Sequence, residues 1–396
     1  MIWECSIFET EFKFEQISYK RSESKFQSRV AFNLQRCYIF FMMENDAFVD
    51  RKKIYKELKA EIYNFLAERN IPARQSKRMV IQGLVLFLSW AVCYSAFLYW
   101  GQQSDILALL LSLPWAFVML MIQLAVMHDG SHGASSESAT MNKLLTSAIS
   151  FIGGSALLWE SQHCHAHHSF TNVHKKDHDI DTGGLLRLHS SQELRSHHQY
   201  QHIYAWMLYP LFVLSWIWWG DLRDIIKNTY SIGPQRMRRV IVEFVIIKVW
   251  HVFLFLILPA LVFKSFALAL ICYLISFSLL GFFMVIIFQL AHMTGVQSLP
   301  ENEKALGDDF TLRQVLTTVN FATDNRFLTW VIGGLNFQIE HHLFPQMSHV
   351  NYPVIQPLVV AFCQKKGIPY FNYPNVMEAV SGHQNHLRQM GCAPLS

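Results

Sequence analysis

The chain has 396 residues, of which 52% are hydrophobic, 14% aromatic and only 16% charged, and its mean hydropathy is positive. This composition excludes an ordinary soluble protein of this length. The small net charge of +4 gives no nucleic-acid footprint, and the sequence has no internal repeat, low-complexity tract or dinucleotide-binding glycine motif.

Residues 1–78 are predicted to form an N-terminal cytoplasmic extension with an amphipathic lead-in. The first 40 residues mix charged and aromatic side chains without a sustained apolar core, which predicts no cleavable signal. The seven cysteines are scattered without metal or disulfide spacing, which favours a reduced, cytoplasm-facing setting.

Four apolar runs are each close to the ~20 residues needed to cross a bilayer. The first pair, about Met79–Trp100 and Ile106–Met127, is joined by the short turn Gly101–Asp105. The second pair is about Val240–Phe263 and Phe266–Ala291. The sequence therefore predicts an all-α polytopic membrane protein with two transmembrane hairpins.

Two shorter apolar stretches, Leu144–Trp159 and Trp206–Trp219, are predicted to be interfacial or re-entrant helices. Basic residues precede the first and third spans, which places both flanks in the cytoplasm. These residues are Arg69, Arg74, Lys77, Arg78, Arg223, Lys227, Arg236, Arg238 and Arg239. The loop from His128 to Arg239 and the tail after His292 are then expected on the cytoplasmic side.

The first histidine cluster, His128 and His132, follows the second predicted span. Residues four positions apart lie within about 40° on a helix, so both imidazoles are expected to reach one metal ion. The second cluster reads WESQHCHAHHSFTN. At about 100° per residue, His163 and His167 share a face, while His165 points about 200° away from His163 and is excluded.

His168 lies about 100° further round the same helix and is expected to reach a second metal ion. The third cluster, GGLNFQIEHHLFP, predicts a short helical turn with Gln338, His341 and His342 on one face. His292, at the cytoplasmic end of the fourth span, is expected at the depth of His128.

These eight imidazoles are too many for one tetrahedral zinc ion and suit two metal ions with open positions for a substrate. Imidazole ligands suit iron, zinc or copper, and their spacing does not choose among these metals. Asp129 and Glu340 either orient a ligating imidazole or are simply solvated.

Histidines outside the clusters are expected to be ordinary. His189, His251 and His383 are predicted to be surface or snorkelling residues. A further set of residues is expected to have structural or solvated roles rather than to contact the metal site or a lipid headgroup. This set is His174, Asp177, His178, Asp179 and Asp181. A last set of histidines has the spacing of metal ligands but is not predicted to form a metal site: His197, His198 and His202.

Together the clusters resemble the membrane fatty acid desaturase family, whose three histidine boxes read HxxxH, HxxxHH or HxxHH, and QxxHH. Here the boxes run from His128 to His132, His163 to His168, and Gln338 to His342. The stretch GGLNFQIEHHLFPQMSHVNYP is similar to the front-end, linoleoyl-CoA-desaturase-like branch. The resemblance covers roughly Phe87 to Tyr370.

The resemblance implies four transmembrane helices and a cytoplasmic cap that holds two non-haem iron ions, with O2 as co-substrate. It implies that Gln338 hydrogen-bonds within the site. It divides the chain into residues 1–78, a desaturase domain at 79–370 and a cytoplasmic tail at 371–396. The ligands it implies are His128, His132, His163, His167, His168, His341 and His342, with His292 matching the extra histidine after the last span.

The expected substrate is a long-chain acyl-CoA or acyl-lipid in a bacterial inner membrane or the endoplasmic reticulum. No HPGG motif of a fused cytochrome b5 domain occurs, so a separate electron donor of cytochrome b5 or ferredoxin type is expected. Side chains alone cannot attack unactivated C–H bonds, so the expected reaction is metal-assisted, O2-dependent formation of a cis double bond.

Three rival functions are weighed against desaturation. A di-iron hydroxylase or ketolase shares the histidine pattern, but the QIEHHLFP context favours desaturation. A histidine-rich metal transporter needs polar residues within its spans, whereas these histidines lie at helix ends and in loops. A metal-free lipid-binding relative is disfavoured by the intact clusters.

Overall fold

The computed structural model describes residues 52–302 and 309–392. This part of the chain is mostly helical, as predicted, and its two short strands, β1 (Asn320–Phe321) and β2 (Asn372–Tyr373), pair in parallel. Most of the predicted extension at residues 1–78 lies outside the described residues.

The helical segments of the first half, η denoting 3-10 or π turns, are α2 (Lys52–Glu68), α3 (Lys77–Gly101), α4 (Asp105–Met121), η1 (Ile122–Met127), α5 (His128–Ser131), α6 (Ala139–Thr146), η2 (Ser147–Ile152), α7 (Ala156–Trp159), η3 (Glu160–His167), η4 (His178–Ile180) and η5 (Ser196–Tyr200). Those of the second half are α8 (Gln201–Leu208), η6 (Tyr209–Leu211), α9 (Phe212–Ser215), η7 (Trp216–Gly220), α10 (Asp221–Lys227), α11 (Pro234–Val252), η8 (Phe253–Ile257), α12 (Leu258–Phe263), α13 (Phe266–His292), α14 (Phe310–Thr317), α15 (Arg326–Val331), α16 (Gln338–Leu343), η9 (His349–Asn351), α17 (Tyr352–Lys366) and α18 (Val376–Met390).

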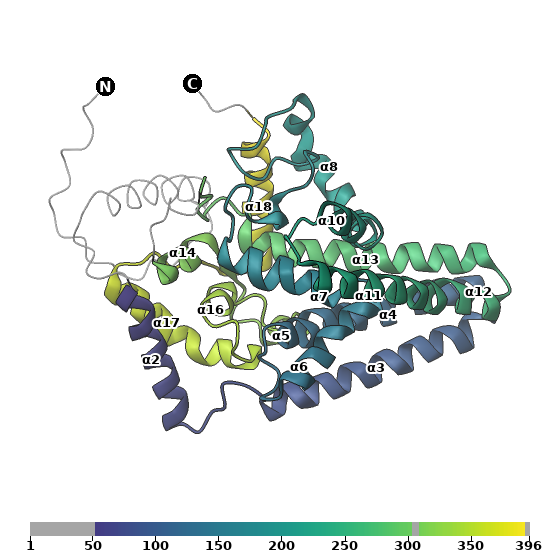
Figure 1. Ribbon diagram of the computed structural model, residues 1–396, viewed down its shortest axis with the longest axis horizontal. Helices are drawn as coiled ribbons and strands as arrows, with labels where there is room; N and C mark the ends of the chain where they lie inside the picture. Colours follow the sequence, from purple (N-terminus) through teal and green to yellow (C-terminus); the bar gives the residue numbers. More distant parts are fainter. Residues whose placement is uncertain (1–51, 303–308, 393–396) are drawn as a thin grey trace. The chain divides into compact units, whose positions relative to one another are not determined.

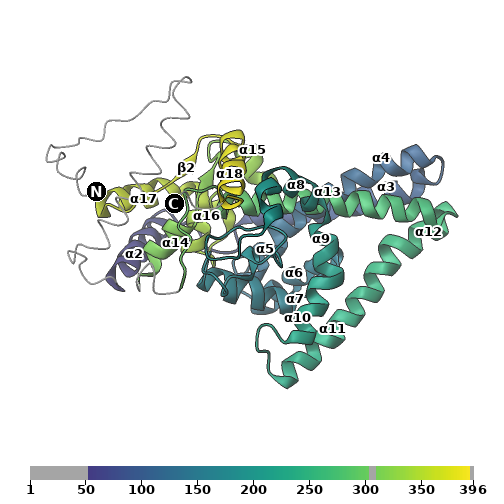
Figure 2. The same ribbon diagram turned by 90° about the horizontal axis from the view of Figure 1, so that it is seen from above.

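Two long helical hairpins form the elongated part of the described chain. The first pairs α3 with α4, which continues through η1 into α5, and the second pairs α11–η8–α12 with α13. The second turn is tight because Lys264 adopts a left-handed conformation (φ 54°) and the Ser265 side chain caps α13 by accepting from Leu268 N. Figures 1 and 2 show both hairpin turns at the same end, away from α5 and α16.

The outer faces of the hairpins are apolar. Leu84, Leu88, Val249 and Leu261 are each about two-thirds exposed although they lie on long helices. Water would oppose so large an apolar surface, whereas lipid would solvate it. Five segments are long and apolar enough to cross a membrane: Lys77–Gly101, Asp105–Ser131, Ser196–Lys227, Pro234–Phe263 and Phe266–His292. The protein is therefore an integral membrane protein.

The third of these segments, Ser196–Lys227, differs from the sequence expectation. Trp206–Trp219 was expected to be too short to span, but helical turns continue from Ser196 to Lys227, because the polar residues on both sides of the apolar stretch also adopt helical conformation. The segment crosses α13 at Gly281, where an added Cβ would lie 2.9 Å from Pro210 O. The other predicted interfacial stretch is broken by Gly153, which has φ 90°.

The hairpins meet in an aromatic core. Trp115 of α4 stacks on Phe255 of η8 with ring centroids 5.1 Å apart, and Phe97 of α3 and Phe277 of α13 pack against the same indole. All four rings are at most 2% exposed. Such aromatic pairs add about 0.5–1.5 kcal/mol each beyond the burial of their area, so this cluster holds the two hairpins together.

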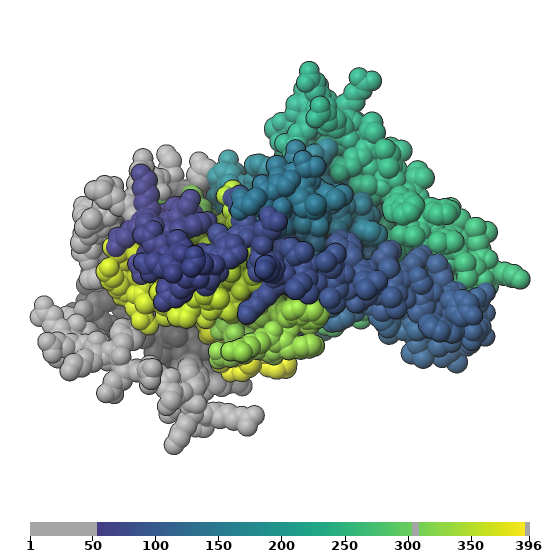
Figure 3. Space-filling view, turned by 90° about the horizontal axis from the view of Figure 1, so that it is seen from below, coloured from purple at the N-terminus to yellow at the C-terminus, as the bar shows by residue number. Residues whose placement is uncertain are grey.

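The helices after α13 are braced by α2. Tyr55 donates a hydrogen bond to Leu343 O (3.1 Å), and Lys366 contacts Glu57 (2.7 Å). Figure 3 shows the purple residues of α2 beside the yellow residues of α17. Gly333 fixes the position of α16 relative to the first hairpin: its φ is 61°, and an added Cβ would lie 2.5 Å from Leu124 O in the π turn η1.

Candidate metal centre

Four separate elements bring the eight predicted imidazoles together. His128 and His132 come from α5 and the residue after it, His163, His167 and His168 from η3 and its end, His341 and His342 from α16, and His292 from the end of α13. In three overlapping groups, one ligand atom from each histidine lies within 4.8 Å of the others. The first group is His128, His132, His163 and His341; the second group is His167, His292 and His342; His168 joins His341 and His342.

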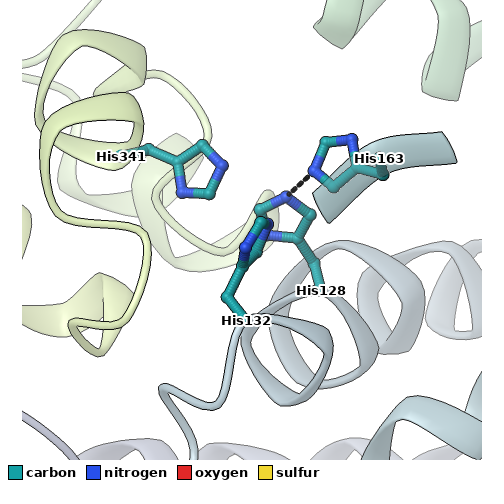
Figure 4. A group of neighbouring side chains, drawn as sticks. All are labelled: His128, His132, His163 and His341. Atoms are coloured by element: carbon teal, nitrogen blue, oxygen red, sulfur yellow. Dashed lines mark hydrogen bonds between the residues drawn. The ribbon is translucent and has the colours of Figure 1, made fainter. Parts of the chain in front are cut away.

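The rings of the first group turn toward one another from three elements, as Figure 4 shows. The Nε2 atoms of His128 and His163 are 3.0 Å apart. The ring centroid of His128 lies 4.9 Å from that of His132 and 4.5 Å from that of His341. The outer face of His163 stacks on the Trp159 indole, with centroids 4.5 Å apart.

The second group is equally close. The ring centroid of His292 lies 4.7 Å from that of His167 and 5.0 Å from that of His342. His168 connects the two groups: its Nε2 is 3.1 Å from Nε2 of His341, and its ring stacks on His342 with centroids 4.3 Å apart. The eight histidines therefore form one continuous cluster.

A π-helical turn explains why His168 lies in this cluster. Residues Glu160–His167 adopt π conformation, and the backbone N–H of His168 donates to His163 O, five residues earlier. A π turn is wider than an α turn, so residues five apart come close to one face. At 100° per residue an α-helix would place His168 about 140° from His163, and the wider π turn makes this angle smaller. His165 remains outside the cluster, as predicted, and its Nδ1 bonds to Glu160 O.

Two carboxylates contact the outer nitrogen of His167. Its Nδ1 lies 3.0 Å from Asp177 and 3.3 Å from Asp179. Burial alone would lower the pKa of His167, but these two negative charges raise it to about 9. Asp177 is itself held by the backbone N–H of Asn172 (2.8 Å). The expectation that Asp177 and Asp179 are only structural or solvated was wrong, because the turn after the second box folds both back onto it.

Neutral groups hold the two histidines of the third box. His341 Nδ1 contacts the Tyr352 hydroxyl at 3.1 Å, and His342 Nδ1 contacts Gln314 Oε1 at 2.9 Å. Gln314 also donates to His168 O (2.8 Å), so one amide links the second and third boxes. With the outer Nδ1 atoms occupied, the Nε2 atoms of both histidines are left to face inward.

The residues expected to orient the imidazoles have different surroundings. Gln338 is buried next to His292. Asp129 accepts hydrogen bonds from the backbone and ring of His349 (3.1 and 2.8 Å), a residue outside the cluster. Asp129 is therefore buried rather than solvated, and it ties the first box to the loop after the third.

Glu340 is also buried rather than solvated. Asn320 and the Tyr370 hydroxyl each donate to it at 2.7 Å, and burial raises the pKa of Glu340 to about 7. These contacts attach the third box to β1 and to the segment before β2. Nothing in the sequence spacing pointed to His349, Tyr352, Gln314, Asn320 or Tyr370, because each lies beyond the three boxes.

Several histidines were wrongly expected at the surface. His189, His251 and His383 are all 0% exposed. His251 bonds to the Tyr273 hydroxyl (3.0 Å), and His383 bonds to the Tyr209 hydroxyl (2.7 Å). Each has found a polar partner inside the fold, which a lone histidine in a sequence does not reveal. The other histidines set aside lie outside the metal-binding groups of the described residues: His174, His178, His197, His198 and His202.

The donor atoms of the cluster fit metal cations. Burial, with the neighbouring imidazoles, lowers the pKa of His163, His168, His341 and His342, so these rings are neutral at pH 7 and offer lone pairs. Among the described residues, Nε2 of His132 and Nε2 of His167 are buried without a hydrogen-bond partner. Buried polar atoms are normally satisfied, and a bound metal ion would satisfy these.

Comparison with known proteins agrees with this geometry. A family model described as "Fatty acid desaturase" matches residues 104–374. The chain is 30% identical to an "Acyl-lipid (8-3)-desaturase" of Physcomitrium patens, over 86% of this chain and 72% of that protein. It is also 30% identical to an "sn-1 linoleoyl-lipid 6-desaturase" of Arthrospira platensis (86% and 93%) and to "Delta(5) fatty acid desaturase A" of Dictyostelium discoideum (89% and 78%).

Proposed function

Because the chain belongs to the fatty acid desaturase family and is a fatty acid desaturase, we propose that its histidine cluster would hold two iron ions and that the enzyme forms a cis double bond with O2 as co-substrate. The observation that carries this proposal is the convergence of eight imidazoles, seven of them on buried residues, from four elements on two adjacent centres. When bound, the two iron ions supply the O2 chemistry that removes hydrogen from an unactivated methylene.

We assign the ligands by position. His128, His132, His163 and His341 hold the first ion, and His167, His292 and His342 hold the second, with His168 between them. Asp177 and Asp179 keep Nε2 of His167 facing inward and increase its basicity through Nδ1, as carboxylates commonly do for ligating imidazoles. Trp159 covers the outer face of His163 and limits the access of water to that side.

We propose that four helices span the membrane, as the following count supports. Three apolar segments, at residues 196–227, 234–263 and 266–292, separate His128 from His292. Both histidines belong to one cluster, so an even number of these segments must cross between them. The turn after Phe263 lies at the same end as the turn after Gly101 (Figures 1 and 2), so α11–α12 and α13 are the crossing pair. Residues 196–227 then lie along the membrane surface.

The histidine boxes then share one side with the basic flanks of the first and third spans. We propose that this is the cytoplasmic side and that a separate cytochrome b5-type or ferredoxin-type donor delivers electrons there. The substrate that we propose is a long-chain acyl group esterified to a lipid, because two of the relatives above carry "acyl-lipid" or "linoleoyl-lipid" in their names.

Expression in a desaturase-deficient host tests this function, with mass spectrometry of lipid classes and localisation of double bonds. We expect the wild-type chain to produce an acyl species that has lost two hydrogens, and His341→Ala to produce none. His165→Ala is the matched control, since that imidazole lies in the same box but points away from the cluster. A product that has gained an oxygen atom would indicate a hydroxylase. A new double bond made by His341→Ala would exclude the assigned site.

A further inference from the structure

The helix that carries the second box begins at a turn surrounded by charged side chains. Gly153 in this turn is left-handed (φ 90°), and Ser155 is the N-cap of the continuous helical segment Ala156–His167. Asp221 of α10 and Glu243 and Lys248 of α11 all reach this turn. The two helices that carry them belong to apolar segments long enough to cross a membrane.

Glu243 occupies the N-terminus of the second-box helix. It accepts hydrogen bonds from Ser155 Oγ (2.5 Å), Ala156 N (3.2 Å) and Leu157 N (3.4 Å). The first backbone N–H groups of a helix have no partner within the helix and carry its partial positive charge. A carboxylate at this position therefore both satisfies these donors and interacts favourably with the helix dipole. Ser155 Oγ accepts from the next free donor, Leu158 N (3.3 Å).

Other contacts hold the same turn and fix the direction of the helix. Lys248 donates to Gly153 O (2.5 Å), and Asp221 accepts from Ser155 N (3.3 Å). Further along, Arg236 pairs with Glu160 (3.4 Å). Since Arg236 precedes Glu243 while Glu160 follows Ser155, α11 runs antiparallel to the second-box helix. One proposed membrane span therefore contacts this helix at its start and at its middle.

An ionisable side chain in an apolar helix is unfavourable unless it has a specific role. Glu243 is only half-buried and touches none of the eight histidines, yet the helix it caps carries three of them. Metal ligands must be held within roughly 0.5 Å of their working positions, which a loose helix end cannot guarantee. We propose that Glu243 is a positioning residue, which anchors the second-box helix to the second hairpin so that His163, His167 and His168 meet the other ligands. This inference rests on the proposed metal function of those histidines.

The test uses the full chain in detergent and three variants. Glu243→Leu removes both acceptor oxygens and the charge, Glu243→Gln keeps one acceptor, and Arg239→Gln removes an exposed charge on the same helix. Two quantities are measured: hydrogen exchange of the metal-free protein in peptides covering residues 156–168 and 338–343, and the iron-to-protein ratio after reconstitution. The exchange measurement needs neither turnover nor metal, so it separates failure of this inference from failure of the proposed desaturase chemistry.

We expect Glu243→Leu to exchange at least about tenfold faster in residues 156–168 but not in 338–343, and to bind half the wild-type iron or less. Glu243→Gln should recover most of both properties, and Arg239→Gln should match the wild type. Unchanged exchange in residues 156–168 would overturn the proposal. Faster exchange throughout the chain of Glu243→Leu would also overturn the proposal, since the carboxylate would then stabilise the whole fold. Wild-type iron content in Glu243→Leu would overturn it too, since the carboxylate would then have no effect on the metal site.

Discussion

The two groups of histidines look alike in the sequence but have different surroundings. In the first group, a tyrosine hydroxyl contacts His341 and an indole covers His163. In the second group, two carboxylates contact His167, and an amide contacts His342. The second group therefore receives negative charge at Nδ1 of His167, whereas the contact to Nδ1 of His341 in the first group is neutral.

This difference bears on how the two metal ions would behave. Negative charge behind an imidazole increases its basicity and strengthens its bond to a cation. The second ion should therefore be held more tightly through His167 than the first ion is through any single ligand. Two centres with unequal electrostatic surroundings provide a basis for unequal roles in O2 chemistry, and the following predictions test this asymmetry.

The largest effect is expected from removing a ligand. His341→Ala opens the first group, and because Nε2 of His341 also lies 3.1 Å from that of His168, the second centre is disturbed too. We expect activity to fall by more than about 100-fold, beyond the loss typical for residues that only support a ligand. Assays of acyl-chain desaturation with equal amounts of membrane-inserted protein measure this. If His165→Ala is equally inactive, loss of activity does not distinguish the imidazoles that face the cluster from His165, which points away from it, and the ligand assignment is contradicted.

Gly333→Ala should damage both groups together, because Gly333 positions α16, which supplies a histidine to each. The left-handed conformation and the 2.5 Å approach to Leu124 O together predict a destabilisation on the order of 3 kcal/mol. Thermal unfolding in detergent measures it. Gly183→Ala is the control: Gly183 has φ 65° but nothing within 4 Å, so only about 1 kcal/mol is expected. Equal losses would contradict the packing argument.

Asp177→Asn should affect mainly the second centre. The amide keeps the shape of the side chain but removes one of the two charges behind His167, so we expect iron affinity there to fall about 10- to 100-fold. Release of iron to a chelator should then show one faster phase, with the other unchanged. Asp181→Asn, an exposed carboxylate nearby, is the control and should release iron like the wild type. Acceleration of both phases would show that the two centres are not electrostatically distinct.

Tyr352→Phe should have the smallest effect. It removes one neutral hydrogen bond to His341 from a hydroxyl in a fully packed position, and we expect less than about a tenfold change in iron release at the first centre. The same chelator experiment measures it, with the exposed Tyr200→Phe as control. A larger effect than that of Asp177→Asn would reverse the proposed order of the two centres.

Much of the metal centre was readable from spacing. Helical periodicity predicted that His128 and His132 lie together and that His165 points away from the cluster. Both predictions concern residues within one or two turns of a single helix. The position of His168 was less well predicted, because a π turn changes the angle per residue and has no clear signature in the sequence. Asp177, Gln314 and Tyr352 were missed as contacts to the site, since each reaches it only after a change of chain direction.

The sequence by itself determined that this is a helical membrane protein with three histidine boxes, because long apolar runs and short polar repeats are local patterns. It also placed the helices of the two hairpins to within six residues at each end. Only the tertiary structure decided which imidazoles share a centre, which carboxylates stand behind them and how Glu243 caps the second box. Many of these relations join residues far apart in the chain, 88 positions for Ser155 with Glu243 and 220 for Asp129 with His349, and they depend on packing that no local pattern encodes.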